Sequence, residues 1–168
     1  SGAVALALAH ERPRALVIGT DISVPALALA RESSERLAIG NVQWLQSDWY
    51  AQLPPDAEPF DVIVSNPPYV QQGDAHLQQG DLRFEPLQAL TAGVDALLAL
   101  RRVIDGAKSR LREGGCLAVE HGYDQADRVR TLLESAGFAE VRDARDLAGI
   151  PRVSYGRFEP SRLRAEAL

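Results

Sequence analysis

The chain has 168 residues, of which 46% are hydrophobic and 24% charged; this is the mixture of one folded domain, not of a disordered or collagen-like chain. Its 18 Lys and Arg against 23 Asp and Glu give a formal charge of -5, so non-specific binding of nucleic acid through phosphates is not expected to be its main task. No apolar stretch approaches the ~20 residues of a membrane span, and the single Cys116 cannot form an internal disulfide, which fits a cytoplasmic location.

Apolar blocks of helical and strand character alternate along the chain. In order, the pattern predicts a helix at 3–10, a strand at 15–20, a helix at 25–38, strands at 42–46 and 60–65, a helix at 94–112, a strand at 116–120, a helix at 124–136, and strands at 141–145 and 152–157. Such alternation indicates an α/β fold with a mostly parallel sheet covered on both faces. Residues 71–91 are a long polar segment, and loops of that length are often functional.

Polar side chains follow three of the predicted strands, and open α/β sheets bind ligands beyond the carboxyl ends of their strands. The first is Asp21, which could accept both hydroxyls of a ribose or, alternatively, cap the next helix. The second is Asp48 with Trp49, where the carboxylate could accept from an adenine amine and the indole could cover an aromatic ring. The alternative for this pair is a turn aspartate beside a packing tryptophan.

The third is the tetrapeptide Asn66-Pro67-Pro68-Tyr69, which the two prolines make stiff. It could hold a planar amide or amino group whose two N–H bonds donate to the Asn66 oxygen and the Pro67 carbonyl, with the plane stacked on Tyr69. The alternative is an Asn-Pro turn that closes a strand and places Tyr69 in the core. We favour the binding role, because a turn needs only one proline and does not explain the amide. Glu120-His121 is a weaker candidate, and a lone histidine without metal-ligand spacing gives no reason to expect a metal.

These runs resemble S-adenosylmethionine-dependent methyltransferases that modify planar nitrogens, and the resemblance covers nearly the whole chain to about Phe158. It narrows to the peptide chain release factor glutamine methyltransferases (the HemK/PrmC family) on the segments VIVSNPPYV at 62–70, LQSDW at 45–49, HLQQGD at 76–81, RFEPL at 83–87 and EHG at 120–122. The resemblance implies a Rossmann-like class I methyltransferase sheet, with residues 1–158 as the catalytic domain and 159–168 as a C-terminal tail. It also implies S-adenosylmethionine as cofactor, S-adenosylhomocysteine as product, and a cytoplasmic enzyme.

The resemblance assigns roles to individual residues. Asn66, Pro67, Pro68 and Tyr69 would grip the substrate glutamine amide, with Asn66, Pro67 and Tyr69 as the catalytic set. The cofactor would be held by Gly2 at its methionine part, Asp21 at its ribose, Asp48 and Trp49 at its adenine, and Asn66. The substrate would be the glutamine of a Gly-Gly-Gln motif in a release factor, with no DNA and no membrane as partners.

The resemblance also bears on the start of the chain. Residues 1–9 match the tail of the family's cofactor-binding turn and its first helix, so we expect the first strand of the sheet and an N-terminal helical domain to be missing here. An expression scar is the alternative. If the first strand and most of the cofactor-binding turn are missing, we expect the isolated chain to bind cofactor weakly or not at all.

Three rival functions stay open at this point. The same tetrapeptide would suit an adenine methyltransferase acting on rRNA or DNA, which splays its target base out of the stack. A second rival is a glutamine methyltransferase of a ribosomal protein. The third is a non-catalytic binding module with a degenerate site.

Overall fold

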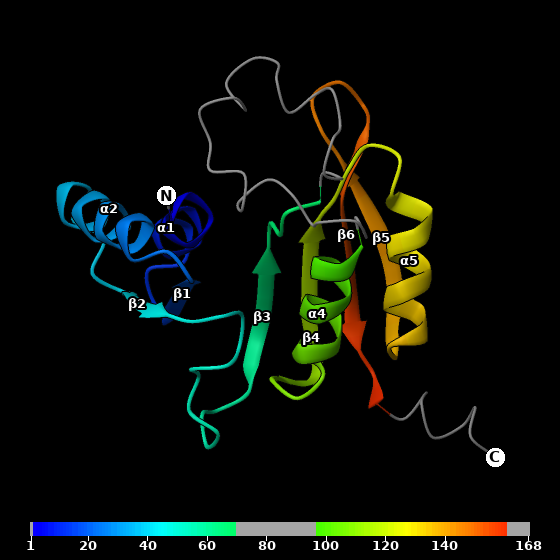
Figure 1. Cartoon of the computed structure of the whole chain (residues 1–168), viewed down its shortest axis with the longest axis horizontal. Coiled ribbons are helices and arrows are strands. Elements are labelled where there is room, and N and C mark those ends of the chain that lie inside the picture. Colours follow the sequence, from blue (N-terminus) through cyan, green and yellow to red (C-terminus); the bar gives the residue numbers. More distant parts are fainter. Residues whose placement is uncertain (1, 70–96, 161–168) are drawn as a thin grey trace. The chain divides into compact units, whose positions relative to one another are not determined.

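The computed structural model describes residues 2–69 and 97–160, which divide between two compact units, Ser1–Ala57 and Glu58–Leu168. The elements are α1 (Ala3–Glu11), β1 (Val17–Asp21), α2 (Val24–Arg36), β2 (Val42–Gln46), β3 (Phe60–Ser65), α4 (Leu98–Ala107), β4 (Leu111–Glu120), α5 (Ala126–Ser135), β5 (Phe138–Arg145) and β6 (Pro151–Phe158) (Figure 1). The polar segment 71–91, the first three residues of the helix predicted at 94–112, and residues 161–168 of the predicted tail lie outside the described residues.

The first unit is a βαβ arrangement. Strands β1 and β2 pair in parallel from Val17↔Val42 to Asp21↔Gln46, and α2 makes the crossover between them. The indole of Trp44 packs where a Cβ at Gly19 would lie only 2.3 Å from it, so glycine is needed opposite this side chain. The Trp44 indole N–H also donates to the Ser34 hydroxyl at 3.2 Å, which ties β2 to α2.

The second unit contains a four-stranded sheet in the order β3-β4-β6-β5. The β3–β4 pair is parallel, whereas β4–β6 and β5–β6 are antiparallel. The expectation of a mostly parallel sheet is therefore wrong for this unit. The reason is the short connection at 146–150, where the Asp146 amide donates to the Ile150 carbonyl at 2.9 Å; a tight hairpin can join only antiparallel strands.

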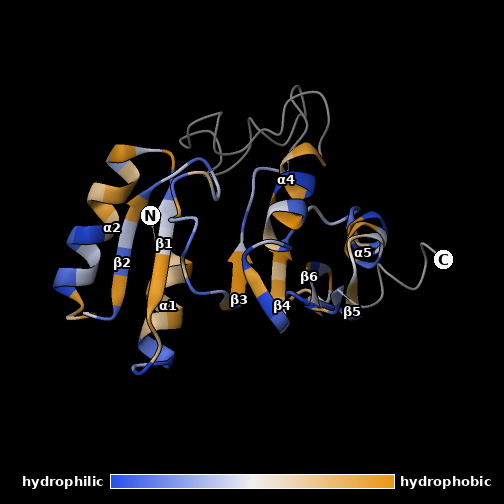
Figure 2. Ribbon diagram, turned by 90° about the horizontal axis from the view of Figure 1, so that it is seen from below, coloured by the Kyte–Doolittle hydropathy of each residue, from blue (hydrophilic) through white to orange (hydrophobic). Residues whose placement is uncertain are grey.

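Helices α4 and α5 contact each other and pack against this sheet, and the shared interface is the apolar core of the unit. The aromatic pair Phe138 and Phe158 lies here with ring centroids 5.4 Å apart. Figure 2 shows hydrophobic residues along much of β3 and β4. The other core members are buried side chains of α4, α5 and β4: Leu100, Val103, Ile104, Leu117, Val119, Val129 and Leu133. Among the described residues, Val62 and Val64 of β3 remain 52% and 39% exposed, so the expected cover on both faces is not seen there.

The boundary between α4 and β4 differs from the prediction. The predicted helix at 94–112 ends at Ala107, and β4 begins at Leu111 rather than at residue 116. Gly114 and Gly115 therefore lie inside a strand, not after a helix. They lie where the β3–β4 register shifts between Phe60 and Val62. Gly114 has a φ of 75°, which favours glycine, and a Cβ on Gly115 would lie only 2.9 Å from a backbone oxygen.

Candidate functional site

Asp21 is the last residue of β1 and is half-buried. One carboxylate oxygen accepts from the Ser23 amide at 2.8 Å, and Ser23 itself caps α2 by accepting from the Ala26 amide at 3.3 Å. The helix cap is therefore Ser23, not Asp21. Because one amide bond uses only part of the acceptor capacity of a carboxylate, Asp21 can still accept hydrogen bonds from hydroxyl groups.

The turn after β2 carries Asp48 and Trp49 on the same sheet edge as Asp21, since the Ser47 amide donates to the Asp21 carbonyl at 3.0 Å. The buried Ser47 hydroxyl holds the turn by donating to the Trp49 carbonyl at 2.8 Å. Trp49 has a φ of 54°, an uncommon conformation for a bulky residue, and the Asp48 carboxylate is exposed. Burial raises the pKa of the neighbouring Tyr50 phenol.

Gly2 precedes α1 with a φ of 74°, and a Cβ there would lie 2.5 Å from the Trp44 ring. Both the conformation and the close approach require glycine at this position. The packing accounts for the glycine without a ligand, and its predicted contact with a cofactor stays a prediction.

In the second unit, residues 66–69 form the corner that follows β3. Asn66 is exposed, Pro67 is fully buried, and Pro68 and Tyr69 are half-buried. No peptide bond among the described residues is cis, so the two prolines extend the chain in their fixed φ range. The corner thus combines a stiff, anchored backbone at Pro67 with the exposed side-chain amide of Asn66.

Tyr69 is neither a free surface ring nor a core residue. Its hydroxyl donates to the Glu120 carboxylate at 3.1 Å and accepts from the Arg152 guanidinium at 2.9 Å, and that guanidinium also lies over the ring, 5.5 Å from its centroid. Burial raises the pKa of Tyr69, the Glu120 charge raises it further, and the Arg152 charge opposes both. The alternative that places Tyr69 in the core is therefore not what the structure shows.

His121 follows Glu120 and is fully buried in a polar chain that crosses the sheet. Its Nε2 lies 2.9 Å from the Ser154 hydroxyl, and Ser154 donates to the Asp143 carboxylate at 2.8 Å. The Nδ1 of His121 lies 2.9 Å from the Gly122 carbonyl, so both ring nitrogens have a polar partner. His121 thus has a structural role in joining β4, β6 and β5.

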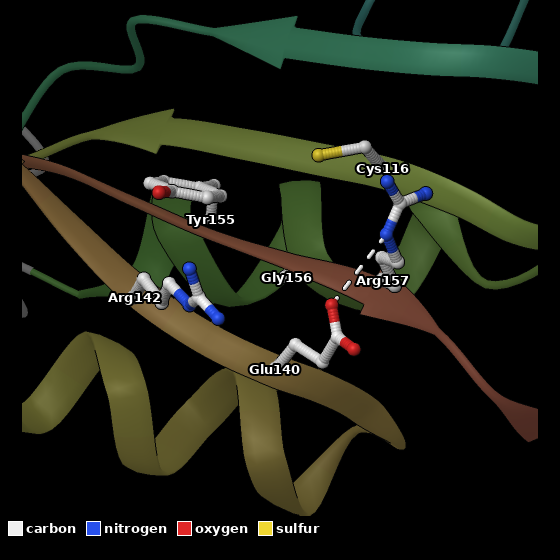
Figure 3. A pocket seen from close by; sticks show the side chains of 6 residues that line it. All are labelled: Cys116, Glu140, Arg142, Tyr155, Gly156 and Arg157. Atoms are coloured by element: carbon white, nitrogen blue, oxygen red, sulfur yellow. Dashed lines mark ion pairs between the residues drawn. The ribbon is translucent and has the colours of Figure 1, made fainter.

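A separate shallow pocket of about 180 Å³ opens on the strands of this sheet (Figure 3). Arg157 forms an ion pair with Glu140 across this pocket, with 3.7 Å between Nε and Oε2. Burial raises the pKa of the Cys116 thiol, and the Arg157 charge opposes this increase. None of the residues predicted to bind substrate or cofactor lines it. The lining residues are Cys116, Glu140, Arg142, Tyr155, Gly156 and Arg157.

Three residues surround the corner, of which sequence reasoning missed Gln125 and Arg152 and gave Glu120 only as a weaker candidate. Glu120 and Arg152 contact the Tyr69 hydroxyl, and Gln125 donates to the Tyr69 carbonyl at 3.1 Å. Glu120-His121 is a weaker candidate in the sequence and part of the segment EHG that carries the resemblance, whereas no motif marks Gln125 or Arg152. Their positions at the end of β4, the start of α5 and the start of β6 become meaningful only once the sheet order is known.

Comparison with known proteins gives these features a family context. The profile of the methyltransferase-domain family matches residues 1–150. A release factor glutamine methyltransferase of Burkholderia pseudomallei is 51% identical over 162 residues, covering 94% of this chain and 56% of the relative. One from Bordetella pertussis is 51% identical over 156 residues, covering 93% and 57%. The chain spans about half the length of the curated relatives it matches.

Solved structures show the same fold at lower identity. A ribosomal protein L11 methylase of Lactobacillus delbrueckii superposes with a TM-score of 0.64 at 21% identity, covering 94% of this chain and 66% of that one. A methyltransferase of Pyrococcus furiosus gives a TM-score of 0.61 at 20% identity, covering 90% and 68%. These matches support the predicted Rossmann-like α/β fold. Within the described residues, no helix is long and apolar enough to cross a membrane.

Proposed function

The chain belongs to the methyltransferase-domain family, and on that basis we propose that it transfers a methyl group to the side-chain amide nitrogen of a glutamine. We further propose that this glutamine lies in the Gly-Gly-Gln motif of a peptide chain release factor. In this proposal residues 1–158 form the methyltransferase domain. The identities to curated release factor glutamine methyltransferases support the choice of substrate.

The observation that carries the proposal is the corner at the carboxyl end of β3. An exposed Asn66 stands directly before the buried, rigid Pro67, and the Tyr69 ring is fixed two residues later by side-chain contacts. A glutamine side chain is a planar amide with two N–H donors. The Asn66 oxygen and the Pro67 carbonyl are acceptors that suit those two donors, and the ring suits the amide plane.

The corner would act by alignment. An amide nitrogen is a poor nucleophile because its lone pair is delocalised into the carbonyl. Holding both amide hydrogens would aim the nitrogen at the methyl group for an in-line displacement, and alignment of this kind can supply ~7–11 kcal/mol of a barrier. We assign no general base, because the nitrogen becomes acidic only as the new bond forms.

The first unit offers groups that fit S-adenosylmethionine. Asp21 keeps acceptor capacity at the end of β1, and the exposed Asp48 carboxylate follows the adjacent strand. We propose that Asp21 accepts from the ribose hydroxyls, that Asp48 and Trp49 hold the adenine, and that Gly2 contacts the methionine part. When bound, this cofactor supplies an activated methyl group on a sulfonium.

The experiment is a methyl-transfer assay with radiolabelled S-adenosylmethionine and the protein expressed from its complete reading frame. We expect label on the release factor, mapped to the Gly-Gly-Gln glutamine by mass spectrometry, and none on a release factor carrying Gln→Ala at that position. Label on ribosomal RNA, DNA or a ribosomal protein instead would contradict the proposed substrate.

Binding at two salt concentrations separates the same alternatives. Association with an oligonucleotide through phosphates weakens steeply as salt rises. We expect binding to the release factor to change less than binding to any oligonucleotide over the same range.

A further inference from the structure

Tyr69 is held at its backbone as well as at its hydroxyl. The side-chain N–H₂ of Gln125 donates to the Tyr69 carbonyl at 3.1 Å, while the side-chain oxygen of Gln125 accepts from the Gly122 amide at 2.9 Å. These two bonds define which way the amide of Gln125 points, because only its nitrogen can donate to a carbonyl. One buried side chain, 6% exposed, therefore ties the corner to the turn between β4 and α5.

Gln125 occupies the N-cap position of α5 but forms no side-chain cap bond with the helix. Ser, Thr, Asp and Asn are the residues usually selected there, because they can satisfy the free amides of the first turn. Here the side chain is directed away from the helix to Tyr69. Gly122 leaves room for it, since a Cβ at that position would lie 3.1 Å from Gln125. Helix capping does not explain this residue.

The ring is fixed by a second set of contacts, at its hydroxyl. Glu120 ends β4 and Arg152 lies at the start of β6, and the Arg152 guanidinium is 3.9 Å from the Glu120 carboxylate. Their side chains are 33% and 28% exposed, so the ion pair itself contributes little to the stability of the fold. The pair sets the direction of the Tyr69 hydroxyl, and the guanidinium lies at the hydroxyl end of the ring, 5.5 Å from its centroid.

We infer that Gln125, Glu120 and Arg152 are positioning residues, which hold the Tyr69 backbone and ring so that a planar amide can stack on the ring. The inference rests on the proposed function for its consequence in catalysis. None of the three touches the reacting atoms; each acts through Tyr69.

The first test is Gln125→Glu in the protein expressed from its complete reading frame. The ionised side chain of Gln125→Glu keeps an acceptor for the Gly122 amide and places an oxygen, not a donor, against the Tyr69 carbonyl. We expect kcat/KM for the release factor to fall at least tenfold, with KM for S-adenosylmethionine unchanged, because a displacement of about 1 Å in an aligned site can cost ~10²-fold in rate. Gln43→Glu, at an exposed position in β2, is the matched control and should leave both constants as in the wild type.

Arg152→Gln is the second variant, which tests the same role if Gln125→Glu does not fold. Its matched control is Arg128→Gln, at an exposed position on α5. Arg152→Gln should also lower kcat/KM for the release factor and leave KM for S-adenosylmethionine unchanged. Arg128→Gln should change neither constant. A wild-type kcat/KM in a folded Gln125→Glu or in Arg152→Gln overturns the positioning role. An inactive wild-type protein contradicts the proposed function instead, and the next measurement then decides the inference.

That measurement is an NMR titration of ring-labelled tyrosine, with the Tyr69 signal assigned by Tyr69→Phe. Removing the Glu120 charge in Glu120→Gln should lower the pKa of Tyr69, and removing the Arg152 charge in Arg152→Gln should raise it. A general loosening of the fold would not move the pKa of Tyr69 in opposite directions in the two variants. If neither variant moves the Tyr69 titration, the three-residue clamp does not exist in solution.

Discussion

Asp21 shows how a single side chain can serve both the fold and the proposed site. Its position at the end of a parallel strand was predictable from the sequence, but its partner was not: the carboxylate accepts from the Ser23 amide, and Ser23 caps the helix. The bond to Ser23 fixes one oxygen of the carboxylate and thereby sets how the group faces a ligand. The proposed ribose contact can therefore be tested without disturbing the helix.

Asp21→Asn makes that test. The amide oxygen of asparagine can still accept from the Ser23 amide, so the fold should be retained, but the charged acceptor for the ribose hydroxyls is lost. Hydrogen bonds to charged groups contribute about 1.5–3 kcal/mol, so in the protein expressed from its complete reading frame we expect the Kd for S-adenosylmethionine to rise roughly ten- to a hundredfold by calorimetry.

The exposed Asp56→Asn serves as the control and should bind as the wild type does. An unchanged Kd for Asp21→Asn, with Asp56→Asn also unchanged, would contradict the ribose role.

The residues around Tyr69 mark the limit of what the sequence could predict about the site. The tetrapeptide at 66–69 is contiguous, so its stiffness and its chemistry can be read directly from the chain. Glu120, Gln125 and Arg152 reach Tyr69 across separations of 51, 56 and 83 residues. Such contacts depend on which strands are neighbours, and local spacing carries no information about that.

At the scale of the element, strands 42–46 and 60–65 were predicted with their observed bounds, because both are short apolar runs between clear turn signals. The start of β4 was missed because Gly114 and Gly115 suggest a helix stop, whereas they accommodate an irregular pairing with β3. The strand at 152–157 was predicted, but the antiparallel direction of β6 was not, because periodicity reports the presence of a strand and not its direction.

The buried polar chain through His121 is a stability element that joins three strands. Ser154→Ala removes the hydroxyl that links Nε2 of His121 to the Asp143 carboxylate, leaving buried polar atoms without that partner. An unsatisfied buried group costs about 1–3 kcal/mol, so we expect the free energy of unfolding in urea to fall by that amount.

Ser109→Ala is the matched control, because Ser109 is exposed and its hydroxyl donates to the nearby Gly106 carbonyl at 3.1 Å. Its effect should stay within about 0.5 kcal/mol. Equal stabilities of the two variants would show that the chain through His121 does not stabilise the sheet.

At the scale of the whole molecule, the fold class was predictable because strands and helices alternate with clear boundaries. The comparisons agree: the methyltransferase-domain profile spans residues 1–150, and solved methyltransferases share the fold. Fold alone does not specify a substrate, since enzymes with this architecture act on different acceptors. The choice of a release factor glutamine therefore depends on the corner at 66–69 and on the curated relatives.

The central claim is that Asn66 holds the acceptor amide, and single-turnover kinetics of Asn66→Ala on the release factor tests it most directly. We expect the rate of methyl transfer to fall about 10²-fold or more, while the Kd for S-adenosylmethionine changes far less, because the lost contact aligns the acceptor. An Asn66→Ala protein that methylates the release factor at the wild-type rate would contradict the account.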